Sequence, residues 1–494
     1  MHAIKLRYVC WAIGAVLLLN CLPLPAQSKA AKPKKKISAV EEAKVRREAM
    51  ALFKEAEAMI GTPSENSEEQ AELFRKALQA NPVFLEAHYN LGLVYANQKK
   101  MKEAAREFEA VLKIEPDFDP GIHLLLATTY QEDGNTGAAI ASLEEGLRRN
   151  PEDSKLLRAL AYLQFNGKND TAAIQNLLRL LAVDPTDRSA HMDLALLFQR
   201  NNEFEKSMDH FKEALRMDPD DYAAHYNLAV LYMRQKNHAD AAMEFEAANK
   251  IRPGNEELLE RLGDVYAFQQ KHEKAVTAYK SALEKASNRG TIFSKLGFSL
   301  ANLNRTEEAA AALENAARLS EKNADVLFLL GDLYGDLKRY DEAIAAYKKS
   351  IEIDPKQKEV RYNLGTLCAE QNKLNDAMAE LKAAVQLDPD YAAAWANLAL
   401  VAEKLDLDAE AIQAHEKVIA LGKGRAMNYF HLGVLYAKSD QIDPAITAFA
   451  RAIEMEPEKY RALLKAELKN VHSILDPVRY KESFTKLLDT APSP

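Results

Sequence analysis

The sequence predicts an all-α protein built as a linear array of about twelve repeats of 34 residues, each consisting of a helix, a turn and a second helix. Three observations support this fold class. Prolines recur at a fixed interval, small residues recur at fixed places between them, and only 18 glycines and 18 prolines interrupt 494 residues. So few helix breakers indicate a mostly helical chain. An array also explains the length, because each repeat buries its apolar face only against its neighbours.

Proline sets the period. Successive prolines of the series are separated by 34 or 35 residues or by multiples of 34, and the series is Pro82, Pro116, Pro151, Pro185, Pro219, Pro253, Pro355, Pro389 and Pro457. Proline cannot continue a helix interior and biases the residue before it away from helical angles. Each proline is therefore expected to end the second helix of a repeat. Twelve repeats fit between Ala51 and Lys459.

Fixed positions within the repeat carry the packing, if each repeat is numbered so that the proline is position 32. Position 7 is leucine in every repeat except the first, and position 8 is always glycine or alanine. On the second helix, position 20 is small and position 24 is often bulky, as in Phe108, Tyr279 and Tyr347. Close-packed helices interdigitate when small residues face large ones. Stacked helix pairs with a small rotation per repeat would form a superhelix with a concave inner face.

Both ends of the array depart from this pattern. In the first repeat, Gly61 to Ser67 is predicted as an extended loop that moves the first helix back toward Ala39, and after Lys459 a capping helix is predicted over Tyr460 to Asn470. A second capping helix is predicted to begin at Asp476, the N-cap of a helix with proline in its first turn. The predicted domains are a signal peptide (1–26), a basic linker (27–38), an atypical first repeat (39–84), the regular array (85–459), and capping helices with a tail (460–494).

The repeat resembles the consensus of a known family. The run His88-Tyr89-Asn90-Leu91-Gly92-Leu93-Val94-Tyr95, followed by Ala104, Phe108 and Pro116, is similar to the tetratricopeptide repeat, and the similarity extends over about 410 of the 494 residues. The chain is identified as a member of that family, of the exported bacterial type. The resemblance implies a right-handed superhelical solenoid whose concave groove binds peptides or proteins.

The resemblance also implies where binding occurs, because the family lines its groove with positions 2, 5, 6, 9, 12 and 13 of the first helices. Several position 6 residues are asparagines, whose amides offer both a donor and an acceptor to a peptide backbone. Aromatic residues at position 5 are candidate anchors, although packing against a neighbouring repeat is an equal alternative. The predicted partner-binding residues are Tyr89, Asn90, Asp193, Tyr226, Asn227, Arg261, Phe328, Tyr362, Asn363, Asn397 and Phe430.

The first 26 residues have the organisation of a secretory signal peptide: a basic start at Lys5 and Arg7, an apolar run over Val9 to Leu19, and a small residue, Ala26, before the expected cleavage site. The apolar run is too short for a comfortable membrane span. We therefore expect a periplasmic or secreted protein. Lipid anchoring at Cys21 is an alternative, and the lysines of 27–38 are predicted to be a solvated linker or a weak contact with anionic membranes.

Composition and motifs favour a protein without catalysis. The net charge of −8, with acidic and basic residues interleaved, argues against nucleic acid. Phosphate-binding loops, metalloprotease motifs and nucleophile elbows are not found in the sequence, and no cofactor is expected. His415 is predicted to be a surface residue and Cys368 a core residue. At position 4, histidines recur at His88, His123, His191 and His225, but successive repeats are expected to hold them too far apart for one metal.

The leading functional prediction is thus a non-catalytic scaffold that binds peptides or protein partners in its groove, outside the cytoplasm. Two alternatives stay open: an envelope component that couples polysaccharide synthesis to export, and a lipid-anchored assembly factor.

Overall fold

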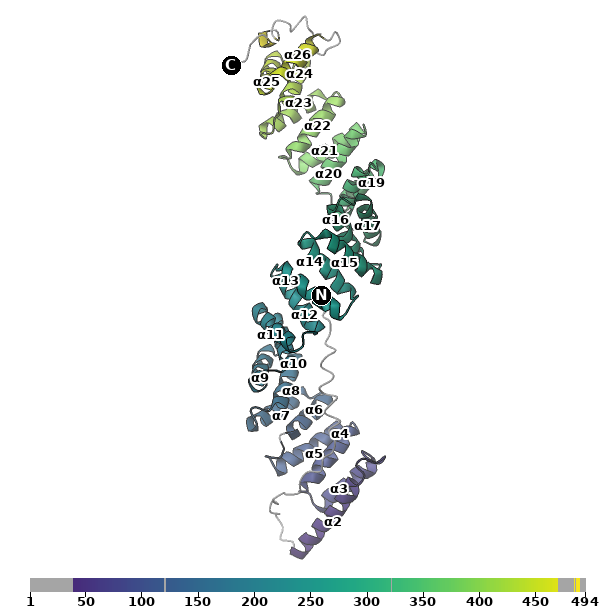
Figure 1. The fold of residues 1–494 in the computed structure, drawn as a ribbon, viewed down its shortest axis with the longest axis vertical. Helices are drawn as coiled ribbons and strands as arrows, with labels where there is room; N and C mark the ends of the chain where they lie inside the picture. Colours follow the sequence, from purple (N-terminus) through teal and green to yellow (C-terminus); the bar gives the residue numbers. More distant parts are fainter. Residues whose placement is uncertain (1–38, 120, 321, 470–483, 485, 489–494) are drawn as a thin grey trace. The chain divides into compact units, whose positions relative to one another are not determined.

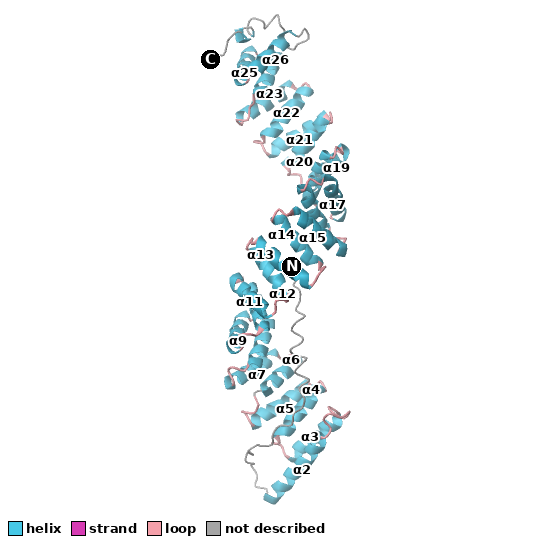
Figure 2. Ribbon diagram, viewed as in Figure 1, coloured by secondary structure: helices cyan, strands magenta, loops and turns pink. Residues whose placement is uncertain are grey.

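The computed structural model describes residues 39–119, 121–320, 322–469, 484 and 486–488. Within these residues all regular structure is helical, and short turns join the helices (Figures 1 and 2). The prediction of an all-α array is confirmed. Residues 1–38 and Asp476, which carry the predicted signal peptide, linker and second capping helix, lie outside the described residues.

The described helices form twelve consecutive pairs followed by a final helix, as the sequence predicted. The first helices of the pairs are α2 (Ala39–Glu57), α4 (Leu85–Asn97), α6 (Gly121–Glu132), α8 (Ser154–Asn166), α10 (Arg188–Arg200), α12 (Tyr222–Arg234), α14 (Glu256–Phe268), α16 (Gly290–Asn302), α18 (Ala324–Asp336), α20 (Lys358–Glu370), α22 (Ala392–Lys404) and α24 (Ala426–Lys438). The second helices are α3 (Glu68–Ala80), α5 (Met101–Ile114), α7 (Thr136–Arg149), α9 (Asp170–Val183), α11 (Phe204–Met217), α13 (His238–Ile251), α15 (His272–Lys285), α17 (Thr306–Leu319), α19 (Tyr340–Ile353), α21 (Leu374–Leu387), α23 (Asp408–Ala420) and α25 (Ile442–Met455), and α26 (Pro457–Lys469) follows.

The turn inside each pair is built around one left-handed residue. Eleven repeats place position 15 at positive φ, and these residues are Lys99, Gly134, Lys168, Asn202, Lys236, Gln270, Asn304, Lys338, Asn372, Asp406 and Asp440. Only one of the eleven is glycine, although the left-handed conformation costs other residues about 1–2 kcal/mol. The packing of the two helices on either side therefore determines the turn, and the turn residue adapts to it.

Contacts between small and large residues hold each pair together, as predicted. Gly92 lies so close to Phe108 that a Cβ on the glycine would be 2.6 Å from a ring carbon, and the same distance is 2.5 Å between Gly331 and Tyr347. The rings at position 24 are almost fully buried, with Phe108 at 0% and Tyr347 at 4% exposure. Within each repeat the core therefore lies between the first helix and the second helix.

A recurring hydrogen bond closes the joints between repeats. The side chain at position 4 contacts the carbonyl oxygen of the proline six residues earlier, and the pairs are His88 with Pro82 (3.2 Å), His191 with Pro185 (3.3 Å), His225 with Pro219 (2.9 Å), Arg361 with Pro355 (3.3 Å) and Trp395 with Pro389 (2.9 Å). The carbonyl at each of these helix breaks thus gains a partner. Three of the four position 4 histidines, His88, His191 and His225, have this structural role.

His123 is the exception, because its repeat has one extra residue between Pro116 and position 4. The His123 ring is 2% exposed, and both ring nitrogens are buried without a hydrogen-bond partner among the described residues. Burial, with a smaller contribution from the charge of Arg149, lowers the pKa of His123. Burial therefore favours the neutral form of this ring.

The chain separates into two compact units, divided within α12 between Leu228 and Ala229. The C-terminal end of the second unit closes its core with α26: Tyr460 is 2% exposed and packs on Phe430, and Phe484 packs edge-on against Phe449. None of the helices in the described part of the chain combines the length and the apolar character that crossing a bilayer requires.

Candidate functional site

The predicted partner-binding residues all lie on first helices, five in the first unit and six in the second. Within each unit, some first helices of successive repeats touch one another, as α6 touches α8 and α18 touches α20. In the described part of the chain, the second helices of the same two repeats, α19 and α21, touch each other less than the first helices α18 and α20 do. The first-helix side is thus the narrower, concave side of the local stack, and we call it the inner face.

The predicted aromatic anchors divide into two groups. Tyr226 and Phe430 are buried, at 8% and 9% exposure, and Phe430 packs against Phe449 and Tyr460 at ring distances of 5.4 Å. Their rings belong to the core. The other three aromatic residues are half-buried: Tyr89, Phe328 and Tyr362.

The predicted asparagines of the inner face are all half-buried, and each uses its amide nitrogen inside the protein. Asn90 and Asn227 donate to the carbonyl oxygens four residues earlier in their own helices, at 2.8 Å each. Asn363 donates to Asp332 at 2.9 Å and Asn397 to Thr366 at 2.8 Å, so these two tie one repeat to the preceding one. None of the four amide oxygens accepts a hydrogen bond within the described residues. The asparagines therefore present acceptors, not the donor and acceptor pair that the sequence suggested.

Three repeats of the second unit share an arrangement that the sequence analysis missed, which we call a carboxylate bridge. A polar side chain at position 24 donates to a carboxylate on the first helix of its own repeat, and position 6 of the next repeat donates to the same carboxylate. The bridges are Tyr279–Asp264–Lys295 (2.8 and 2.8 Å), Tyr347–Asp332–Asn363 (2.6 and 2.9 Å) and His415–Glu403–His431 (2.6 and 2.7 Å).

The cue for these bridges was present in the sequence. Tyr279, Tyr347 and His415 are 68 residues apart, at a position that is otherwise apolar in most repeats, and each is accompanied by an acidic residue on the preceding helix. The prediction that His415 lies on the surface is wrong. Its side chain is 1% exposed, because position 24 faces the core whatever residue occupies it.

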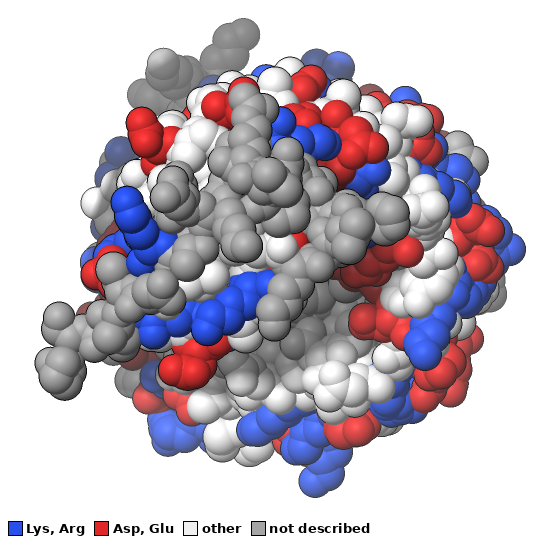
Figure 3. Space-filling view, turned by 90° about the horizontal axis from the view of Figure 1, so that it is seen from above, with Lys and Arg blue, Asp and Glu red and all other residues white. Residues whose placement is uncertain are grey.

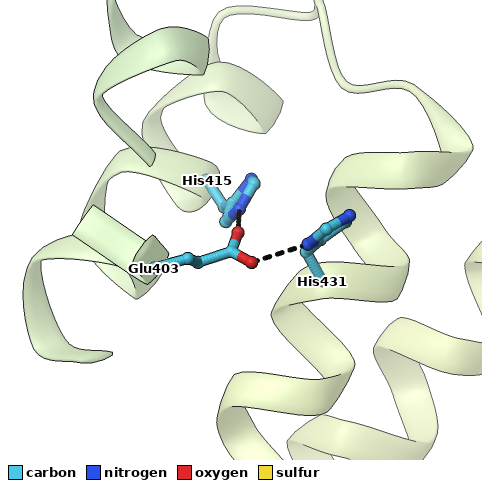
Figure 4. A group of neighbouring side chains, drawn as sticks. All are labelled: Glu403, His415 and His431. Carbon is cyan, nitrogen blue, oxygen red and sulfur yellow. Dashed lines mark hydrogen bonds and ion pairs between the residues drawn. The ribbon is translucent and has the colours of Figure 1, made fainter. Parts of the chain in front are cut away.

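The third bridge differs from the others in its electrostatics (Figure 4). Its residues come from α22, α23 and α24, and the two imidazoles lie on either side of the Glu403 carboxylate. Burial works to raise the pKa of Glu403, but the hydrogen bonds from His415 and His431 outweigh it and lower the pKa to about 2. In the second bridge burial prevails over hydrogen bonding, and the pKa of Asp332 is raised.

Asp193 of the first unit also occupies position 6, but it forms no bridge. It is half-buried on α10 and has no hydrogen bond or ion pair within the described residues. Arg158 is the nearby cation, and it is bound by both carboxylate oxygens of Asp187. Burial raises the pKa of Asp193 to about 6, against the opposing charge of Arg158. Asp193 is thus a desolvated carboxylate that lacks a hydrogen-bond partner among the described residues.

The remaining predicted residue, Arg261, is exposed and forms an ion pair with Glu257 one turn earlier in α14, at 3.5 Å. Basic and acidic side chains are interspersed over the described surface that Figure 3 shows. Cys368, at 0% exposure, lies in the core, and burial raises the pKa of its thiol.

Comparison with known families agrees with this architecture. Models described as Tetratricopeptide repeat match residues 85–118, 124–190, 192–256, 256–288, 295–358, 336–403 and 428–459. These matches cover more than half of the chain. The chain therefore belongs to the tetratricopeptide repeat family, whose members are typically non-catalytic scaffolds for protein interactions.

Several solved structures are similar over part of the chain. YrrB, described as a TPR protein with an unusual peptide-binding site, is 23% identical, with 37% of this chain and 95% of YrrB covered and a TM-score of 0.35. The C-terminal part of a TPR repeat-containing protein from Cytophaga hutchinsonii is 18% identical, with coverages of 51% and 98% and a TM-score of 0.42. MamA is 22% identical, with coverages of 33% and 94% and a TM-score of 0.31. Among curated protein sequences, none matches this chain.

Proposed function

We propose that the protein is a non-catalytic scaffold that holds peptides or segments of partner proteins against the inner face of its repeats, outside the cytoplasm. Asp193 is the observation that carries this proposal. A half-buried carboxylate without a hydrogen-bond partner costs folding free energy, and the cost is recovered when a donor arrives. A scaffold that binds at Asp193 would give this residue its missing partner.

The inner face favours ligands that donate hydrogen bonds. Asp193 offers a carboxylate, and Asn90 and Asn227 of the same unit offer amide oxygens, while the half-buried Tyr89 adds an aromatic surface. Backbone N–H groups of an extended peptide fit the amide oxygens, and a lysine or arginine side chain fits the carboxylate. The proposed ligand is therefore an extended segment with a basic residue.

A peptide-display selection tests this proposal on the full chain. Peptides selected against the wild-type protein should share a lysine or arginine, and Asp193→Asn should reduce their binding because the variant removes the charge and keeps the shape. Asp209→Asn is the matched control: Asp209 is an exposed carboxylate on α11, the second helix of the same repeat. Equal losses for the two variants, or binders without basic residues, would refute the proposed role of Asp193.

The location outside the cytoplasm rests on the organisation of residues 1–26. Intact mass measurement of the protein isolated from the cell envelope tests it. A mature chain that begins at Gln27 agrees with secretion, and an acylated chain that begins at Cys21 would replace the soluble form by a lipid-anchored one. A chain that retains Lys5 and Arg7 would contradict both forms of export.

A further inference from the structure

We propose that Glu403, His415 and His431 form a binding site for a divalent transition-metal ion such as Zn²⁺. One carboxylate oxygen and one nitrogen of each ring lie within 4.8 Å of one another, and no other group of three such residues is found among the described residues. The site joins three consecutive helices across two repeats (Figure 4).

The residue types distinguish this bridge from the other two. Tyr279 and Lys295 flank the carboxylate in the first bridge, and a tyrosine and an amide flank it in the second. A protonated lysine, a tyrosine hydroxyl and an amide are poor ligands for zinc. Two imidazoles and a carboxylate are a well-established zinc ligand set, which leaves a fourth position open to water or another ligand. Of the three carboxylate bridges, which share one arrangement, the third therefore has the side chains that can bind a metal ion.

The rearrangement that a metal requires is small. The ligand atoms are now in hydrogen-bond contact, with 2.6 Å between His415 Nε2 and Glu403 Oε1 and 2.7 Å between His431 Nδ1 and Glu403 Oε2. Ligands about 2.0–2.2 Å from a tetrahedral zinc lie about 3.3 Å from one another. The contact to the coordinating oxygen must therefore open by less than 1 Å, and the three ligand atoms, which now lie within 4.8 Å of one another, must reach this common spacing, which side-chain rotation can supply.

The site has a buried end and an accessible end. His415 is 1% exposed, Glu403 is 23% exposed and His431 is 33% exposed. A metal can thus enter beside His431, at position 6 of the inner face, and its fourth coordination position would lie on that side. The buried ring and the carboxylate would supply the fixed part of the site.

Asn428 supports the buried ring. Its amide oxygen accepts from the backbone N–H of Arg425 at 2.9 Å, so its amide nitrogen is directed at His415 Nδ1, 3.3 Å away. Without metal, His415 is therefore protonated on Nε2, which donates to Glu403. A metal on Nε2 would shift the ring proton to Nδ1, and the Asn428 amide would then have to turn and give up its hydrogen bond from Arg425 in order to accept that proton.

Calorimetric titration of the untagged full chain with ZnCl₂, after treatment with EDTA, tests the proposal. We expect one zinc per chain, and Glu403→Gln and His431→Asn should each weaken binding by about tenfold or more. His431→Asn reproduces the donor that Asn363 supplies in the second bridge, so it is expected to fold normally. His191→Gln is the control. His191 and His210 also form a pair of imidazoles, with 2.9 Å between their Nδ1 atoms, but they belong to a different repeat.

Two further measurements separate a site from unspecific binding. Zinc should raise the melting temperature of the wild type and of His191→Gln by the same amount, and that of His431→Asn by less. Co²⁺ should give the wild type an absorption spectrum typical of tetrahedral coordination, which Glu403→Gln should lose. Zinc affinity that is equal in wild type and His431→Asn, or no binding at about 100 µM zinc, would overturn the proposal.

Discussion

Gly331 and Gly335 lie four residues apart in α18, and adding one methyl group to each should have opposite effects on stability. At Gly331 the added Cβ would lie 2.5 Å from Cε1 and 2.6 Å from Cδ1 of Tyr347. At Gly335 no neighbouring atom lies within 4 Å of the added Cβ. The two substitutions therefore add the same methyl group, at Gly331 against a buried ring and at Gly335 into open space.

The magnitudes follow from two opposing effects. Replacing glycine by alanine inside a helix stabilises a protein by about 0.5–1 kcal/mol, and Gly335→Ala should show this gain. Gly331→Ala should also suffer overpacking, which costs about 1–3 kcal/mol. The Tyr347 ring cannot easily move away, because it is 4% exposed and its hydroxyl donates to Asp332 at 2.6 Å. We expect the two variants to differ by about 2 kcal/mol in free energy of unfolding.

Urea denaturation followed by circular dichroism measures this difference, and hydrogen exchange of the α18 and α19 amides shows whether the effect is local. A repeat array need not unfold in one step, so the local measurement is required. In the background of Tyr347→Leu, Gly331→Ala should cost much less, since other repeats combine alanine at position 8 with leucine at position 24, as in Ala127 and Leu143. If Gly331→Ala is as stable as Gly335→Ala, close packing does not explain the glycine.

Three further predictions concern single residues of the inner face and turns. The pKa of Asp193 is raised to about 6 from 3.8, so between these pH values the native state binds more protons than the unfolded state and loses stability as the pH rises. Asp193→Asn should remove this loss. If the variant changes the melting temperature equally at pH 4 and at pH 7.5, the prediction is contradicted. Asn363→Ala should lower the free energy of unfolding by about 1 kcal/mol because Asp332 loses a donor, whereas Asn227→Ala should change it by less than about 0.5 kcal/mol. Similar losses for the two variants in urea denaturation would argue against the carboxylate bridge. Lys338 is exposed and has a φ of 57°. Lys338→Gly should stabilise the protein by about 0.5 kcal/mol, because the relief of the left-handed conformation exceeds the entropy cost of glycine. A lower urea midpoint for the variant would show that the turn is not strained.

The helix pairs were predictable because the information for them is periodic. A small residue at position 8, a large one at position 24 and a proline at position 32 recur often enough that an exception, such as the missing proline in two consecutive repeats between Pro253 and Pro355, does not hide the period. Gly92 with Phe108 and Gly331 with Tyr347 pack as this period requires. Each contact joins two helices of one repeat, so the sequence spacing alone fixes which residues meet.

Contacts between neighbouring repeats were harder to predict. The carboxylate bridges need a donor at position 24, an acid at position 9 or 12 and a second donor in the next repeat, and the acid of the third bridge, Glu403, lies one helical turn from the acid position of the other two. Side-chain rotation decides whether such groups meet. The burial of Tyr226 and Phe430 has the same origin, because position 5 lies at the border between inner face and core.

The joint between repeats has a consequence for chain length. At Pro116 one extra residue separates the proline from His123, and the ring loses the carbonyl contact that its counterparts make. The helices on either side nevertheless keep their packing, with Ile122 at 1% and Phe108 at 0% exposure. An insertion at a joint is thus absorbed locally at the expense of about one hydrogen bond. Joints of this kind are where length variation can accumulate in such a protein, and where a reporter peptide could be introduced while the adjoining layers stay intact.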